Sequence, residues 1–185
     1  IANKGMVRTF QLTKSLAKMT VLDNMLLGAA EQKGESLRNA LLPSRWRQQE
    51  NIILGKAEDL LERFKLSHMR DEYAATLSGG QRKLLEMARA LMSEPKLILL
   101  DEPMAGVNPV LVESLLVHIE NLRDEGVSVL FIEHDMDAIM GISDWIVVLA
   151  EGQVIAEGTP SDVSKNPAVI DAYLGTAIAE ELKDV

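Results

Sequence analysis

The segment Leu97-Ile98-Leu99-Leu100-Asp101-Glu102-Pro103 decides how this chain is expected to fold. Its continuous apolar run predicts a strand covered on both faces, as strands of parallel sheets are. Two acids end the run, and ligands of open α/β sheets bind at the carboxyl ends of the strands. Asp101 could hold Mg²⁺, which prefers oxygen ligands, and Glu102 could polarise a water that attacks a phosphate. The alternative for this segment alone is a strand that ends in solvated acids.

A second segment, Leu77-Ser78-Gly79-Gly80-Gln81, lies directly before the helical stretch 82–91. A helix N-terminus built from small residues leaves backbone N–H groups open, carries partial positive charge and binds phosphate. Taken alone, the segment is better explained as a loop in which Ser78 is an ordinary helix cap. Its place in the chain argues otherwise, because the loop, a helix, the turn 93–95 and the acid-tipped strand follow in that order.

The rest of the chain alternates between apolar runs and helical stretches. Such alternation predicts an α/β fold with a mostly parallel sheet, and runs broken at Gly152 predict a hairpin. Asp23 and Asn24 are the candidate caps of a first helix. The expected strands are 6–12, 97–100, 127–132, 145–149 and 153–157, and the expected helices are 21–30, 49–64, 109–125, 135–142, one that begins at Ser161 and one from 168 towards 181.

Composition restricts the class of protein without identifying its chemistry. The 185 residues contain no cysteine, which excludes disulfides, thiolate metal sites and cysteine nucleophiles. The formal net charge of -9 disfavours a general nucleic-acid binder, since phosphate affinity comes largely from lysine and arginine. No apolar run approaches the roughly 20 residues that a membrane-spanning helix needs. We therefore expect no nucleic-acid partner and no membrane span in this sequence.

The order and spacing of these motifs resemble the ATP-binding subunits of ABC transporters over essentially the whole chain. Residues 77–81 match the signature motif of that family and residues 97–101 match its Walker B strand. The resemblance implies a P-loop NTPase-type (RecA-like) parallel sheet core with an inserted α-helical subdomain. Its implied divisions are 1–12 for the end of a core part with the Q-loop, 13–92 for the helical subdomain, 93–160 for the RecA-like core, and 161–185 for C-terminal helices.

The resemblance also implies ATP and Mg²⁺ as ligands and gives roles to single residues. Glu102 matches the catalytic glutamate, and His134, in Phe131-Ile132-Glu133-His134-Asp135, matches the switch histidine. In the family, two such subunits bind two ATP molecules head to tail, so the signature loop of one contacts the γ-phosphate held by the other. The implied metal-site residues are Asp101 and Gln11, and the implied nucleotide-binding residues are Gln11, Ser78, Gly79, Gly80, Gln81 and Asn108.

Two features depart from the family pattern. The Walker A sequence G-x-x-x-x-G-K-[ST], whose backbone N–H groups and lysine hold the phosphates, occurs nowhere in the chain. We therefore expect the N-terminal strands and the phosphate loop to be missing, and the 185 residues alone to bind ATP weakly without hydrolysing it. The D-loop, Ala105-Gly106-Val107-Asn108, ends in asparagine where aspartate is the commonest family form. Its contact across a dimer then lacks a charge.

Several stretches resemble one group in the family, the ATPases of branched-chain amino-acid importers. The implied partners are a second ATPase subunit, in a homo- or heterodimer, and transmembrane permease subunits. The implied place is the cytoplasmic face of a bacterial or archaeal plasma membrane. ATPases of lipopolysaccharide or lipid exporters and non-transport ABC ATPases are the alternatives. The stretches that carry this resemblance are 8–11, 19–24, 105–109, 132–136 and 172–175.

Overall fold

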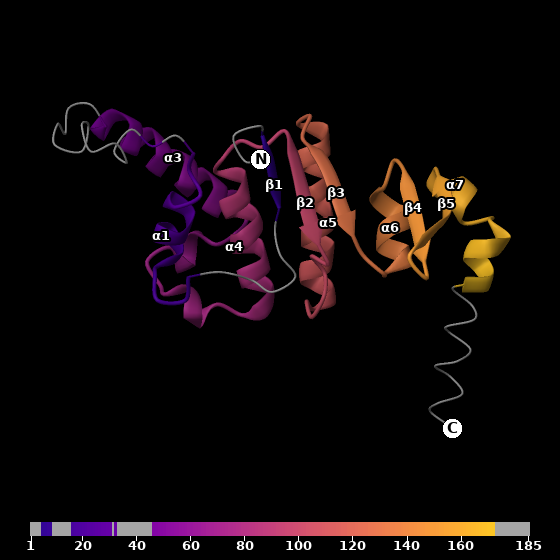
Figure 1. Ribbon diagram of the computed structural model, residues 1–185. Helices are drawn as coiled ribbons and strands as arrows, with labels where there is room; N and C mark the ends of the chain where they lie inside the picture. Colours follow the sequence, from indigo (N-terminus) through magenta and orange to yellow (C-terminus); the bar gives the residue numbers. More distant parts are fainter. Residues whose placement is uncertain (1–4, 9–15, 31, 33–45, 173–185) are drawn as a thin grey trace, which may run out of the picture. The chain divides into compact units, whose positions relative to one another are not determined.

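The computed structural model describes residues 5–8, 16–30, 32 and 46–172 (Figure 1). The chain divides into two compact units, 1–133 and 134–185, and each is described by itself. The first unit contains a parallel sheet with helices, and the second contains a two-stranded hairpin with helices. The divisions that the resemblance implies at 12, 92 and 160 remain predictions.

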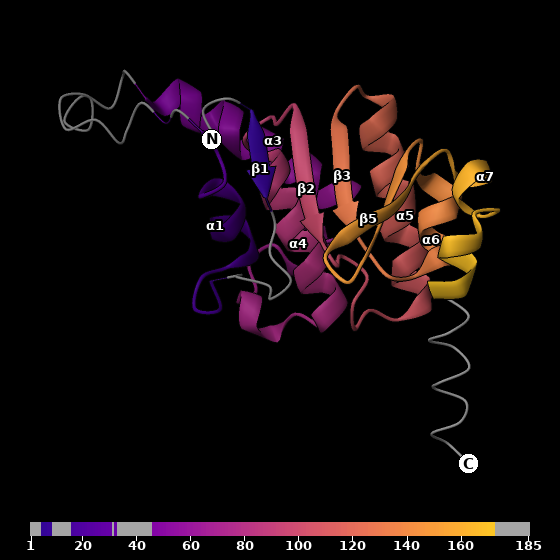
Figure 2. The same cartoon turned by 45° about the vertical axis from the view of Figure 1, so that its right-hand side comes forward.

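The acid-tipped segment is the middle strand of a parallel three-stranded sheet. Strand β2 (Leu97–Asp101) lies between β1 (Met6–Arg8) and β3 (Ser128–Ile132), and both neighbours run parallel to it. Its alternate residues are buried, with Ile98 at 0% and Leu100 at 2% exposure. Figures 1 and 2 show the three strands side by side. The predicted α/β fold with a parallel sheet is thus confirmed.

The described residues of the first unit form four α-helices. They are α1 (Val21–Leu26), α3 (Arg47–Arg63), α4 (Gly79–Leu91) and α5 (Pro109–Asp124). Helix α1 packs on both α3 and α4, and α5 packs on β3. Two short 3-10 turns, Ser67–Met69 and Ala74–Thr76, connect α3 to α4. The fully buried large side chains of this unit include Phe64, Leu61, Leu66, Leu85, Leu115 and Leu122.

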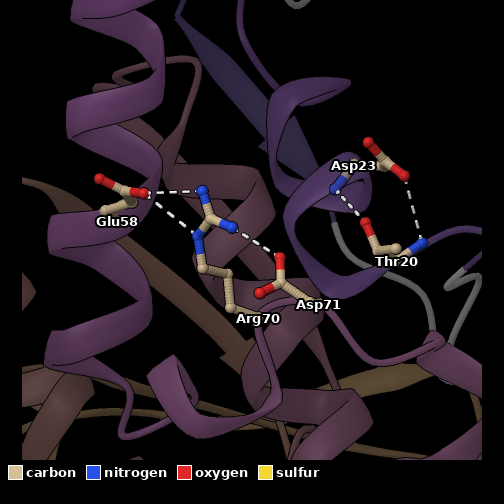
Figure 3. Close-up of polar contacts among 5 residues, drawn as sticks. All are labelled: Thr20, Asp23, Glu58, Arg70 and Asp71. Atoms are coloured by element: carbon tan, nitrogen blue, oxygen red, sulfur yellow. Dashed lines mark hydrogen bonds and ion pairs between the residues drawn. The ribbon is translucent and has the colours of Figure 1, made fainter.

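The start of α1 corrects one prediction. Thr20 caps the helix, and Asp23 completes a reciprocal capping box from the third helical position (Figure 3). Asn24, the other candidate cap, is fully buried inside the helix, where its Oδ1 accepts from the N–H of Leu16 at 2.8 Å. The helix ends at Leu26, short of the predicted residue 30. Gly28 follows and lies against α4, where a Cβ would collide with the carbonyl of Arg89.

One arginine links the loop after α3 back to that helix. The guanidinium of Arg70 donates from Nε and Nη2 to Oε1 of Glu58, at 3.1 and 2.9 Å, and from Nη1 to Asp71 at 2.6 Å (Figure 3). These ion pairs raise the pKa of Arg70, chiefly through the hydrogen bonds to Glu58 and Asp71. Both carboxylates are solvent-exposed, so the pairs contribute little to stability. Their structural effect is to hold the loop near α3.

The second unit is an antiparallel hairpin with helices packed against it. Strands β4 (Ile146–Ala150) and β5 (Gln153–Gly158) pair as predicted, and their core includes Ile146, Ala156, Val163 and Val169. Helix α6 (Met136–Ile142) precedes the hairpin, and α7 (Pro160–Val163) follows it. Thr159, not Ser161, caps α7, because proline fits the first helical position and Asp162 completes the capping box. Residues 167–172 are helical as well.

A buried histidine joins α3 to α5 inside the first unit. The ring of His118 stacks on Phe64, with centroids 4.2 Å apart and planes 26° apart. Within the described part of the chain, neither ring nitrogen of His118 has a hydrogen-bond partner. Burial lowers the pKa of His118, and the nearby cations Arg63 and Lys65 lower it further. The folded chain therefore favours the neutral ring.

This arrangement predicts a pH-dependent loss of stability. The unfolded chain protonates His118 near its ordinary pKa of ~6.5, whereas the folded chain resists protonation. Stability from this residue is complete above that pH and falls as the pH drops below it. Urea unfolding between pH 8 and pH 5.5 should show a smaller loss for His118→Phe, which keeps a stacked ring, than for the parent. His68→Phe, at an exposed position, is the control, and equal losses in all three proteins would contradict the prediction.

Candidate functional site

The two acids at the end of β2 have different surroundings. Asp101 is the last strand residue, and its carboxylate accepts from Nη2 of Arg8 on β1 at 3.0 Å. Glu102 follows with a φ of 46°, a left-handed conformation that is uncommon for a residue with a side chain. Its N–H donates to the carbonyl of Ile132 at 3.0 Å, which extends the β2–β3 pairing past the last strand residue. The chain therefore turns sharply at Glu102.

Two residues that the sequence analysis did not single out hold this turn. Lys83 of α4 donates from Nζ to the backbone carbonyl of Glu102 at 2.9 Å. Glu133, directly after β3, accepts from the N–H of Met104 at 2.7 Å through Oε1. A charged partner makes each bond stronger than an ordinary one. The partners lie 19 and 29 residues apart in sequence, so no local pattern reveals them.

The signature segment forms the capped start of α4. The hydroxyl of Ser78 accepts from the N–H of Gln81 at 3.2 Å, and the side chain of Gln81 accepts from the N–H of Ser78 at 2.9 Å. Ser78 is thus the helix cap that the simpler explanation predicted, and Gln81 completes the box. Gly79 and Gly80 occupy the first two helical positions, whose N–H groups have no acceptor within an α-helix. N–H groups at the start of a helix can bind an anion.

The D-loop residue Asn108 is the cap of α5. Its Oδ1 accepts from the N–H of Leu111 at 3.0 Å, and Pro109 occupies the first turn of the helix. Gly106, with φ of 70°, allows the chain to turn between the acids and this cap. Asparagine and aspartate cap helices about equally well. The neutral residue at this position therefore keeps the start of α5 intact.

The remaining predicted site residues lie elsewhere. His134 is the first residue of the second unit; it is exposed and lies between Ile132, where β3 ends, and Asp135, which caps α6. Gln11 lies outside the described residues. The structure thus brings Asp101 and Glu102 together at the carboxyl edge of the sheet, and it joins α4 to them through Lys83. The assigned roles of these residues remain predictions.

A magnesium ion fits this edge only together with a phosphate ligand. Among residues 5–8, 16–30, 32 and 46–172, no three histidine, cysteine or acidic side chains gather as a metal cluster. Magnesium, however, commonly takes one or two carboxylates, substrate phosphates and several waters. Asp101 offers one such carboxylate, whose oxygen faces the guanidinium of Arg8. The donor set suits a cation that arrives with a nucleotide.

Comparison with known proteins identifies the class. Residues 1–105 match the family model described as ABC transporter, and residues 153–179 match the one described as branched-chain amino acid ATP-binding cassette transporter. This chain belongs to the ATP-binding subunits of ABC transporters, which are ATPases. Within that family it falls in the branched-chain amino acid group, as its C-terminal match and its relatives show.

Its relatives are similar over nearly the whole chain. The probable branched-chain amino acid transport ATP-binding protein LivG of Archaeoglobus fulgidus is 47% identical over 180 residues, which are 97% of this chain and 69% of that protein. The high-affinity branched-chain amino acid transport ATP-binding protein BraF of Pseudomonas aeruginosa is 41% identical, over 96% of this chain and 70% of that protein. The chain therefore spans about 70% of the length of these relatives.

Solved structures support the same fold. An ATP-binding cassette of an ABC transporter in its ADP conformation aligns with a TM-score of 0.75 and 42% identity, over 94% of this chain and 70% of that one. A nucleotide-free cassette aligns with a TM-score of 0.74 and 41% identity, over 93% of this chain and 69% of that one. No helix in the described part of the chain is long and apolar enough to cross a membrane.

The link from Lys83 to Glu102 predicts a stability effect. Lys83→Met keeps the aliphatic stem but leaves the Glu102 carbonyl without its charged donor. We expect the free energy of unfolding to fall by roughly 1–3 kcal/mol, as for other hydrogen bonds to charged groups. Urea denaturation would measure the loss, with Arg82→Met as the matched control one residue earlier on α4. Equal stability of Lys83→Met and Arg82→Met would show that the bond does not hold the turn.

Proposed function

We propose that this chain is the nucleotide-hydrolysing subunit of a branched-chain amino-acid importer, and that Glu102 is its catalytic base. The observation that carries the proposal is the position of Glu102. It directly follows Asp101 at the carboxyl edge of a parallel sheet, in a turn held from both sides by β3 and α4. Ligands of such sheets bind at this edge. A carboxylate fixed there is suited to orient and deprotonate a water beside a terminal phosphate.

The other residues divide the binding of ATP between two subunits. The free N–H groups of Gly79 and Gly80, with the hydroxyl of Ser78, would contact the γ-phosphate held by a second ATPase subunit, while Gln81 keeps the loop in shape through the capping box. Asn108 would lie at the boundary between the two subunits. Asp101 and Gln11 would hold Mg²⁺, which supplies charge neutralisation for the phosphates. His134 would bond a γ-phosphate oxygen through its ring.

The relatives support a proposal for the partners and the substrate. The relatives named above are described as branched-chain amino acid transport ATP-binding proteins. A chain of that group would work beside transmembrane permease subunits, at the cytoplasmic face of the plasma membrane. Substrate recognition would then lie in other subunits of the transporter. Complementation of leucine uptake tests the assignment, with this chain fused to the phosphate-loop segment of a family member and produced in cells that lack their own subunit of this kind. Uptake that stays at the background level while the fused protein is stably produced would contradict it.

The 185 residues alone are proposed to be inactive. They contain no Walker A sequence, so no glycine-rich loop and lysine of that pattern hold the phosphates. Fusion to the phosphate-loop segment that ATPases of this family carry upstream of the Q-loop should create ATP turnover. Micromolar ATP binding by the unfused chain, measured by calorimetry, would contradict the proposed inactivity.

In the fused protein, Glu102→Gln separates binding from chemistry. The amide keeps the size of the side chain but cannot accept the proton of the attacking water. We expect turnover to fall roughly a hundredfold or more, with ATP affinity unchanged, measured by phosphate release and by calorimetry. Glu113→Gln, which neutralises an exposed acid on α5, is the matched control and should turn over like the parent. Normal turnover by Glu102→Gln would show that Glu102 is not the catalytic base.

A further inference from the structure

The two signature glycines have different surroundings. A Cβ added to Gly79 would meet no atom within 4 Å, whereas a Cβ added to Gly80 would overlap Cδ1 of Leu111 and lie 3.5 Å from Cγ1 of Val107. Gly80 is buried and Gly79 is exposed. Neither has a positive φ, so backbone conformation does not require glycine at either position. At Gly80, the end of the Leu111 side chain occupies the space that a Cβ would take.

The residues that fill this space belong to the D-loop and the helix that follows it. Val107 is a D-loop residue, and Leu111 lies in the first turn of α5, where its N–H is the one that Asn108 caps. The start of α4 and the start of α5 are therefore in direct contact at Gly80. Both helix starts carry loops that the proposed function places at the boundary with a second subunit.

We propose that Leu111 is a positioning residue that sets the distance between the signature loop and the D-loop through its contact with Gly80. The inference rests on the proposed function for its effect on catalysis, but the contact itself lies within one chain. Because the side chain of Leu111 leaves no room for a methyl group, the start of α4 lies as close to α5 as a glycine permits. The two loops then move together, and the phosphate-contacting N–H groups keep their place relative to the D-loop.

Two substitutions test this directly: one adds a methyl group at Gly80, and the other shortens the side chain of Leu111. In Gly80→Ala the added methyl overlaps the end of the Leu111 side chain. If Leu111 keeps its rotamer, α4 moves from α5 by about 1 Å, because carbon atoms in contact lie roughly 3.5–4.0 Å apart. Alanine otherwise favours a helix over glycine, so a change in the spacing comes from this contact. In Gly80→Ala/Leu111→Ala the space reopens and the original spacing should return. Gly80→Ala/Leu116→Ala removes a different leucine from the same helix and should restore nothing.

The separation of α4 and α5 can be measured independently of ATPase activity. The chain contains no cysteine, so spin labels on Arg82→Cys and Glu113→Cys report the separation of α4 and α5 without background. We expect a longer separation in Gly80→Ala, the parent separation in Gly80→Ala/Leu111→Ala, and no change in Gly79→Ala. A parent-like separation in Gly80→Ala, as a simple rotation of the Leu111 side chain would give, overturns the proposal.

ATP turnover of the fused protein then tests the catalytic consequence. The turnover of Gly80→Ala should fall roughly a hundredfold, as expected for a misplacement near 1 Å. Gly80→Ala/Leu111→Ala should recover most of the turnover of the parent. Restored spacing without restored turnover would mean that Gly80 acts on the nucleotide alone, and would overturn the positioning role. The fused protein without further substitutions could also be inactive while the variants still show the expected separations. That result would refute the proposed function and leave the role of Leu111 in spacing standing.

Discussion

The backbone of Glu102 connects β2 to both β3 and α4, and the arrangement of the first unit depends on these connections. Its left-handed φ of 46° costs of order 1–3 kcal/mol for a residue with a side chain. Both of its backbone polar groups are bonded to other elements, the N–H to the carbonyl of Ile132 at the end of β3 and the carbonyl to Lys83 of α4. These bonds maintain the conformation. A strand end, a neighbouring strand and the signature helix are thereby fixed to one residue, and the D-loop begins only three residues later.

Most of the fold could be predicted from local patterns. The apolar run of β2 predicted a strand covered on both faces. It is the central strand of the sheet, and its burial alternates: Ile98 and Leu100 are buried, while Leu97 and Leu99 are half-buried. The break at Gly152 identified the β4–β5 hairpin. The helix starts were predicted less well, although the signal was present. Thr20 with Asp23 and Thr159 with Asp162 both fit the capping-box pattern of a hydroxyl residue followed by an acid three positions later.

The contacts around the candidate site could not be predicted in the same way. Arg8 reaches Asp101 over 93 residues, and Lys83 reaches Glu102 over 19. Such pairs form only after the sheet and α4 have come together, so no spacing rule connects them. The motif positions, in contrast, could be assigned by resemblance because the motifs are continuous stretches of sequence. The roles of these residues remain predictions from the resemblance, and the structure adds what holds Asp101, Glu102 and the start of α4 in place.

Asn108 shows why a departure from the family form is compatible with this structure. A residue at that position has a task within the chain, which is to cap α5 through a side-chain oxygen. Asparagine performs this task as well as aspartate, and the lost charge removes only a favourable interaction with the helix dipole of about 0.3–1 kcal/mol. The start of α5, and with it the position of Leu111, is therefore independent of the charge.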